Sequence, residues 1–183
     1  MMIFRSFFWN DICDNYIEAI KYKFYVDDLK VRKISLRNAL NLFYKLIIIS
    51  AIVMPFISEE IYSILYKNFK NVRSIHLESW PAPYQNIPKE LVESGKFGIE
   101  LIKILRMNKS KLQIPLNQGI RKVIILSDEL NLEKIKSLKK DIENTIIIEH
   151  LELIEKSMET SIKEQPNLTE IIEELNVIVY FFK

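Results

Sequence analysis

The sequence has little cysteine, glycine or proline: one, three and six residues respectively among 183. The single cysteine, Cys13, excludes an intramolecular disulfide and is typical of a reducing compartment, so we expect a cytoplasmic location. So few glycines and prolines argue against a disordered or low-complexity chain. The first residues lack the order of a signal peptide, and the longest apolar run, residues 46–57, is about half as long as a membrane span. We therefore expect no membrane partner.

The charged residues are distributed unevenly, although the net charge is only +2. Residues 101–122 carry six Lys or Arg and no Asp or Glu, whereas residues 123–183 carry seven against 13. A basic segment therefore precedes an acidic tail, and such a segment is a candidate for contact with nucleic acid. With 49% hydrophobic residues the chain can build a real core, as one domain or two small ones.

Residues 7–25 have the spacing of an amphipathic helix. Apolar side chains recur there at steps of three and four residues, which places them on one face: Trp9, Cys13, Tyr16, Ile17, Ile20 and Phe24. We expect Trp9 and Tyr16 to pack inside, whereas the cations of this helix project elsewhere.

The remaining sequence predicts a helical half followed by a mixed half. A second helix is expected over residues 35–53 with Leu36 and Leu40 on its inner face, and a third after Pro55 with Ser58 as its N-cap. Three prolines between residues 81 and 88 mark a boundary. Beyond it we predict helices over 89–107 and 131–142, strands over 122–126, 145–153 and 176–182, and a polar connection over 155–170. The fold class is thus multidomain α and α+β: an α-helical bundle over residues 1–82, then a small α+β domain over residues 83–183.

Three motifs carry a family resemblance. The run of residues 9–18, WNDICDNYIE, is similar to the pattern W-x-x-F-C-D-x-Y-[LI]-E, with Asn10 and Ile12 as departures. Residues 54–62, MPFISEEIY, and residues 74–81, SIHLESWP, follow in the order and at the spacing of two further family motifs. Together they resemble the anticodon-binding helical domain of class I aminoacyl-tRNA synthetases of the valine, isoleucine and leucine group. Within that group the chain is most similar to archaeal valyl-tRNA synthetases, and the isoleucyl enzymes are the alternative.

The resemblance implies a binding role. Synthetases of this kind join valine to its tRNA with ATP and magnesium, and this region would hold the anticodon stem-loop. The chain has only two histidines, His76 and His150, and no H-I-G-H segment or glycine-rich phosphate loop. Residues 106–111, RMNKSK, look superficially like a K-M-S-K-S loop but end a helix outside any nucleotide-binding fold. We therefore expect no catalytic residue, no metal and no cofactor in this chain, and no enzymatic activity of the chain on its own.

Two sets of residues are candidates for RNA contact. In the mixed half they belong to the basic segment, where the alternative is an ordinary solvated helix end: Lys103, Arg106, Lys109, Lys111 and Asn117. The valyl-type pattern R-x-x-K…L-N, as the resemblance implies it, coincides with Arg106, Lys109, Leu116 and Asn117. In the helical half the candidates are cations and a stacking aromatic near the first helix and the linker: Arg5, Phe8, Lys21, Lys23, Arg32, Lys33 and Arg37.

The expected partners follow from the same resemblance. They are a valine-accepting tRNA and a synthetase body bound in trans. The family motif begins so close to Met1 that we expect upstream helical residues to be missing and an apolar face of the bundle to be exposed. Self-association through that face is therefore expected. A standalone protein-interaction or scaffold module is the alternative from a different functional class.

Overall fold

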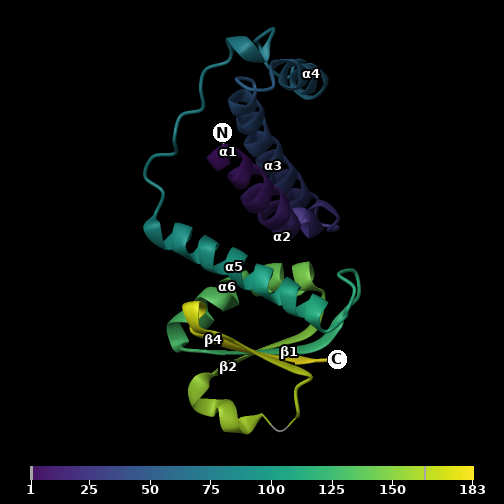
Figure 1. Ribbon diagram of the computed structural model, residues 1–183, viewed down its shortest axis with the longest axis vertical. Helices are drawn as coiled ribbons and strands as arrows, with labels where there is room; N and C mark the ends of the chain where they lie inside the picture. Colours follow the sequence, from purple (N-terminus) through teal and green to yellow (C-terminus); the bar gives the residue numbers. More distant parts are fainter. Residues whose placement is uncertain (1, 163) are drawn as a thin grey trace. The chain divides into compact units, whose positions relative to one another are not determined.

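The computed structural model describes residues 2–162 and 164–183 and divides into two compact units (Figure 1). The helical unit comprises the residues up to Trp9 and Lys23–Ile87, and the mixed unit comprises Asn10–Tyr22 and Pro88–Lys183. The helical bundle followed by a small α+β domain is confirmed as the fold class. The units differ from the predicted domains at residues 10–22 and 83–87, and the predicted domain boundary between residues 82 and 83 stays a prediction. Among the described residues, no helix is both long and apolar enough to cross a membrane.

The N-terminal helical stretch has an unusual geometry. It runs through α1 (Met2–Ser6), the π-helix η1 (Phe7–Ile17), α2 (Glu18–Ile20) and the 3₁₀ turn η2 (Lys21–Phe24). A π-helix has wider turns than an α-helix, so side chains spaced by three and four residues do not share one face. The prediction that Trp9 packs inside is therefore wrong, since 63% of its surface is exposed, whereas Tyr16 is half-buried and burial raises its pKa.

Two helices and a short turn build the rest of the helical unit. They are α3 (Leu29–Ser50), α4 (Pro55–Leu65) and η3 (Ile75–Leu77). Asp28 caps α3 by accepting hydrogen bonds from the backbone N–H groups of Lys30 and Val31. The core lies at the C-terminal half of α3, where three tyrosines pack with isoleucines: Tyr44, Ile47, Ile48, Tyr62, Tyr66 and Ile75.

Two sequence expectations for this unit are wrong. Leu36 and Leu40 are 41% and 47% exposed, because only the C-terminal half of α3 faces the core. The helix α4 begins at Pro55, whose fixed φ suits the first helical position, so Ser58 lies buried inside the helix instead of capping it.

The mixed unit is a four-stranded sheet with two helices on one face. Its elements are α5 (Lys89–Lys111), β1 (Ile120–Ser127), α6 (Glu129–Ile146), β2 (Ile148–Glu155), η4 (Lys156–Ser161), β3 (Leu168–Ile172), η5 (Glu173–Leu175) and β4 (Val177–Phe182). The strand order is β2-β1-β4-β3, with β1 and β2 parallel and the other pairs antiparallel. Figure 1 shows α5 and α6 above the sheet and η4 below it. The strand β3 was not predicted and lies in part within the expected polar connection.

The core of the mixed unit explains the placement of its helices. Alternate β1 residues such as Val123 and Ile125 face α5 and α6 and are fully buried. Gly98 lets α5 approach α6 closely, because a Cβ there would lie 2.5 Å from Cδ1 of Leu138. The helix α6 ends at Ile146, and its C-cap residue Ile147 has φ 62° in the left-handed region, a costly conformation for a β-branched residue.

Candidate nucleic-acid interface

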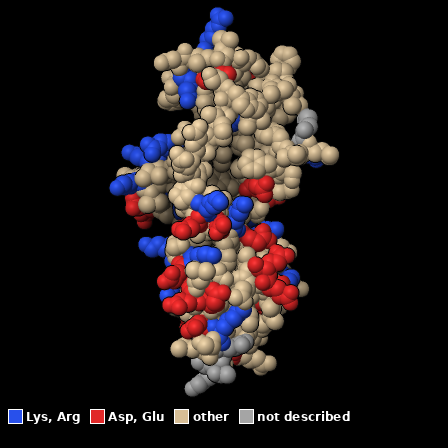
Figure 2. Space-filling model, turned by 90° about the vertical axis from the view of Figure 1, so that its left-hand side faces the viewer, with Lys and Arg blue, Asp and Glu red and all other residues tan. Residues whose placement is uncertain are grey.

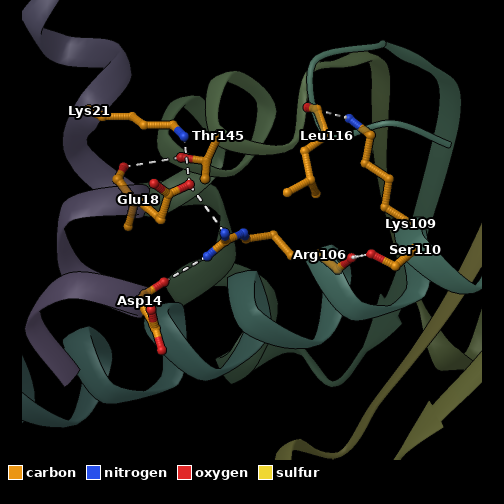
Figure 3. A network of polar contacts seen from close by, with 9 residues as sticks. Asp14, Glu18, Lys21, Arg106, Lys109, Ser110, Leu116 and Thr145 are labelled. Atoms are coloured by element: carbon orange, nitrogen blue, oxygen red, sulfur yellow. Dashed lines mark hydrogen bonds and ion pairs between the residues drawn. The ribbon is translucent and has the colours of Figure 1, made fainter. Parts of the chain in front are cut away.

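Arg106 joins the first family motif to α5. Its guanidinium donates to the backbone carbonyl oxygen of Asp14 at 2.7 Å and pairs with Oε2 of Glu18 at 3.1 Å (Figure 3). Glu18 also pairs with Lys21 at 2.6 Å, and Thr145 Oγ1 donates to the carbonyl oxygen of Ala19 at 3.1 Å. All these residues belong to the mixed unit. Two predicted RNA-binding cations, Lys21 and Arg106, are thus brought together on one carboxylate within the protein.

Lys109 is fully buried and has no acidic partner within the described residues. Its ammonium donates to three backbone carbonyl oxygens, those of Leu116 at 3.0 Å (Figure 3), Ile146 at 2.7 Å and Gln118. Burial lowers the pKa of Lys109. Because an ammonium has only three hydrogens, no donor remains for a phosphate. The expected RNA contact of Lys109 therefore conflicts with its burial, and its structural task is to hold the loop 112–119 against the end of α6.

The remaining cations of the basic segment are paired with acids, one on α5 itself and three from later parts of the chain. Lys103 pairs with Glu100 at 3.1 Å and Lys111 with Glu170 at 3.0 Å. Arg121 pairs with Glu164, and Lys122 pairs with Glu152 at 2.9 Å. Figure 2 shows acidic and basic side chains side by side over the mixed unit, in the lower part of the view. The segment is basic in sequence, but its surface charge is largely neutralised.

Asn117 is exposed in the loop that Lys109 holds. A backbone hydrogen bond of 3.0 Å from Gln118 to Pro115 closes the turn, and Asn117 lies within it. The side-chain amide of Asn117 is accessible to a partner, whereas that of Asn108 on α5 is fully buried.

The cations of α3 differ from those of the basic segment in their pairing. The 22 residues of α3 contain five Lys or Arg and no Asp or Glu. Lys33 and Arg37 are exposed and Arg32 is half-buried, and within the described residues none of the three forms an ion pair. Lys30, which the sequence reasoning missed, shares a face with Lys33 and Arg37 through steps of three and four residues. The absence of acids along this helix is the signal that could have identified it.

These cations lie at the helix end where the helix dipole disfavours positive charge. The N-terminal end of a helix carries a partial positive charge, so each cation in the first turns costs up to about 1 kcal/mol. Residues 30, 32 and 33 lie within the first five positions of α3, and the acid beside them is the N-cap Asp28, whose Oδ1 already accepts from the backbone N–H groups of Lys30 and Val31. A local conflict of this kind is typical of a functional surface.

The remaining candidates lie on the N-terminal helical stretch. Arg5 is exposed on α1, and Phe8 is half-buried with its ring centroid 6.0 Å from that of Phe4. Lys23 is half-buried and has interactions of its own. Tyr22 is half-buried, and its hydroxyl donates to a carboxylate oxygen of Asp141. Burial first and then this carboxylate raise the pKa of Tyr22.

A metal site is not apparent among the described residues. No group of three His, Cys, Asp or Glu side chains gathers there as metal ligands do. The expectation that this chain carries no metal and no cofactor stays a prediction.

Comparison with known proteins agrees with the three motifs. Residues 1–125 match the family described as anticodon-binding domain of tRNA ligase. The valine–tRNA ligase of Pyrococcus horikoshii is 32% identical over 172 residues, covering 93% of this chain and 18% of that protein. The corresponding protein of Thermococcus kodakarensis is 33% identical over the same shares, and that of Methanothermobacter thermautotrophicus is 32% identical over 82% of this chain and 17% of its own.

The chain thus spans about a fifth of the length of the curated relatives it matches. The predicted resemblance to the valyl-type synthetases is confirmed by these similarities. Because the family match covers more than half of its residues, the chain belongs to the anticodon-binding domain family of tRNA ligases.

Proposed function

We propose that this chain binds the anticodon stem-loop of a valine-accepting tRNA and positions that tRNA for a catalytic domain that carries out the attachment. The observation that carries the proposal is the unpaired basic surface of α3, formed by Lys30, Arg32, Lys33 and Arg37. Cations without acidic partners keep their full attraction for phosphate, and each phosphate contact releases counterions. The surface would position the RNA backbone, and it carries no base readout by itself.

The experiment measures how the affinity for a valine tRNA transcript depends on salt. Replacing Lys33 and Arg37 with alanine removes two exposed cations one helical turn apart. We expect this pair of changes to lower the affinity and to reduce the slope of log K against log salt by about 2, because each lost phosphate contact contributes about 0.9.

A matched control is available on α6. Lys136 and Lys140 are also exposed and one turn apart, so their double alanine variant removes the same charge from the mixed unit. It should leave the slope unchanged. Equal effects of the two double variants would mean that only the total charge matters, and the proposed surface on α3 would then be wrong.

The choice of valine tRNA rests on the relatives that the chain resembles. A competition between valine and isoleucine tRNA transcripts tests it, and we expect the valine transcript to compete better. Valine-dependent ATP–pyrophosphate exchange should be absent from the chain alone and present when a separate synthetase body is added. A cytoplasmic location is proposed from the single cysteine.

We also propose self-association through α4. This helix exposes a group of large apolar side chains, among them Phe56 at 89%, Ile57 at 59% and Ile64 at 67%. Ile57 and Ile64 are seven residues apart and so lie on one face of α4, and exposed apolar side chains on one helix face favour protein contact. Sedimentation velocity over a range of concentrations should show a dimer that Ile64→Lys abolishes, whereas Leu130→Lys, at a similarly exposed position on α6, should not affect it. A monomer at all concentrations would refute this second proposal and favour an apolar contact with a different protein.

A further inference from the structure

The loop that follows α4 combines features that the family motifs do not include. Residues 67–73 read KNFKNVR, with three cations, two asparagines and no acid. Phe69, the third residue of the loop, is 84% exposed. Lys67 and Arg73 are exposed at its two ends, and neither forms an ion pair within the described residues.

The backbone of this loop is held from the core of the helical unit. The hydroxyl of Tyr62 donates to the carbonyl oxygen of Val72 at 2.6 Å. The backbone N–H of Phe69 donates to the carbonyl oxygen of Tyr66 at 2.8 Å. Tyr62 and Tyr66 are both buried, so the two sides of the loop are fixed on the same core.

The motif residue Glu59 fixes the chain just beyond the loop. Its Oε2 accepts hydrogen bonds from Ser74 Oγ at 2.8 Å and from the backbone N–H of Ile75 at 3.0 Å. Glu59 thus holds the segment that follows the loop, and among the described residues it forms no ion pair with Lys67 or Arg73. Lys70 turns inward, with Nζ 4.1 Å from the ring centroid of Tyr44. A fixed backbone thus presents one aromatic ring between two unpaired cations.

We propose that residues 67–73 form a second RNA-binding element, in which the ring of Phe69 stacks on an unpaired base. Proteins bind single-stranded nucleotides by placing aromatic rings on base faces beside cations that contact the backbone. Asn68 and Asn71 flank the ring with exposed amides that can both donate to and accept from base edges. The inference rests on the proposed binding of the anticodon stem-loop, and it names the loop nucleotides as the part that this element contacts.

The test uses the full chain and two RNA probes, an anticodon stem-loop hairpin and a fully paired duplex with the same stem. Phe69→Ala should weaken hairpin binding by about tenfold. It should leave duplex binding and the salt slope of hairpin binding unchanged, because stacking releases no counterions. Phe69→Trp should keep the affinity of the natural chain, and its fluorescence should be quenched by the hairpin and not by the duplex. Lys67→Ala should reduce the salt slope by about 1.

Tyr84→Ala is the matched control. Tyr84 is 73% exposed and lies in the same unit, but the ammonium of Lys45 already lies 3.8 Å from its ring centroid. Its removal should not change RNA affinity. If the natural chain binds the hairpin and Phe69→Ala binds it equally well, the stacking role is wrong while the proposed function stands. If the natural chain does not bind the hairpin at all, the proposed function and this inference both fail.

Discussion

Replacing Asn108 with leucine should stabilise the mixed unit. Asn108 is fully buried on α5, and within the described residues neither its Oδ1 nor its Nδ2 has a hydrogen-bond partner. Buried polar groups are nearly always paired, so an orphan amide is a cost that the fold carries. Leucine has the same branching and the same number of heavy atoms as asparagine. It can therefore occupy the site without polar groups to satisfy.

The expected gain can be worked from the two unpaired atoms. Each buried unsatisfied group costs about 1–3 kcal/mol, and leucine favours a helix over asparagine by a few tenths of a kcal/mol. Taking the lower value for both atoms gives a gain of about 2–3 kcal/mol in the free energy of unfolding of the mixed unit. Alanine at Asn108 should be near neutral, because it removes the amide but leaves a void. Aspartate should destabilise strongly, since its charge would be buried without a partner.

Hydrogen exchange is the appropriate measurement, because it resolves the two units. The backbone amide of Val123 in β1 reports opening of the mixed unit, and its protection should rise about 30- to 150-fold in Asn108→Leu. Both tryptophans, Trp9 and Trp80, belong to the helical unit, so their fluorescence during urea unfolding serves as an internal control. Reduced protection of Val123 in the leucine variant would refute the reasoning and indicate that the amide has partners.

Three further predictions concern single contacts. The hydrogen bond from Asn131 N–H lowers the pKa of Asp128, the N-cap of α6, in the folded protein. The stability that Asp128 contributes is therefore present above its unfolded-state pKa and is lost as the pH falls through its folded-state pKa. Asp128→Asn should flatten this acid dependence of the free energy of unfolding in urea titrations. A double-mutant cycle on Arg106 and Glu18, whose pair is half-buried, should give a coupling of about 1 kcal/mol by calorimetry. Ile147→Gly should raise the thermal midpoint, because it relieves about 1 kcal/mol of left-handed strain.

Each of these has its own control. Asp128→Ala should lose about 1 kcal/mol at neutral pH, whereas the asparagine variant keeps the cap; equal losses would contradict the assignment. A cycle between Arg106 and Glu143, which pairs with Lys139 instead, should give no coupling. Ile147→Ala should not show the gain of the glycine variant, because alanine also has a Cβ, and an equal gain would place the cause elsewhere.

The sequence predicted helices and strands correctly where a single hydrophobic pattern ran through most of the element. Helical spacing located α5 and α6, and β-branched runs located β1 and β4. The sequence-based prediction failed where tertiary contacts determine where an element ends. The isoleucines at positions 146–148 predicted a strand beginning at Thr145, but α6 continues to Ile146, whose carbonyl oxygen accepts from buried Lys109. No glycine marks the end of α6 in the sequence, and Lys109 of α5 stabilises this end instead. The edge strand β3 was missed, since its five residues are too few to establish alternation.

The candidate site was harder to predict, because a sequence shows charges and not their pairing. The basic segment and α3 look alike in sequence, each a run of cations without acids. The segment lies in the mixed unit with the acidic tail, and three acids from that tail supply partners: Glu152, Glu164 and Glu170. In the described helical unit, Lys33 and Arg37 have no such partners. Two segments with a similar run of cations therefore differ in whether those cations are available to bind phosphate.

Pairing does not remove the segment from RNA binding entirely. The partners of Lys103 and Lys111 leave those lysines about half exposed, and such surface pairs are worth about 0–1 kcal/mol. A phosphate could replace either carboxylate at little cost, whereas Lys109 would have to give up three buried hydrogen bonds. The cations therefore rank by the cost of freeing them, with α3 first, the surface pairs next and Lys109 last. Alanine variants along this series should reduce the salt slope in that order, and a large slope change at Lys109 would contradict the ranking.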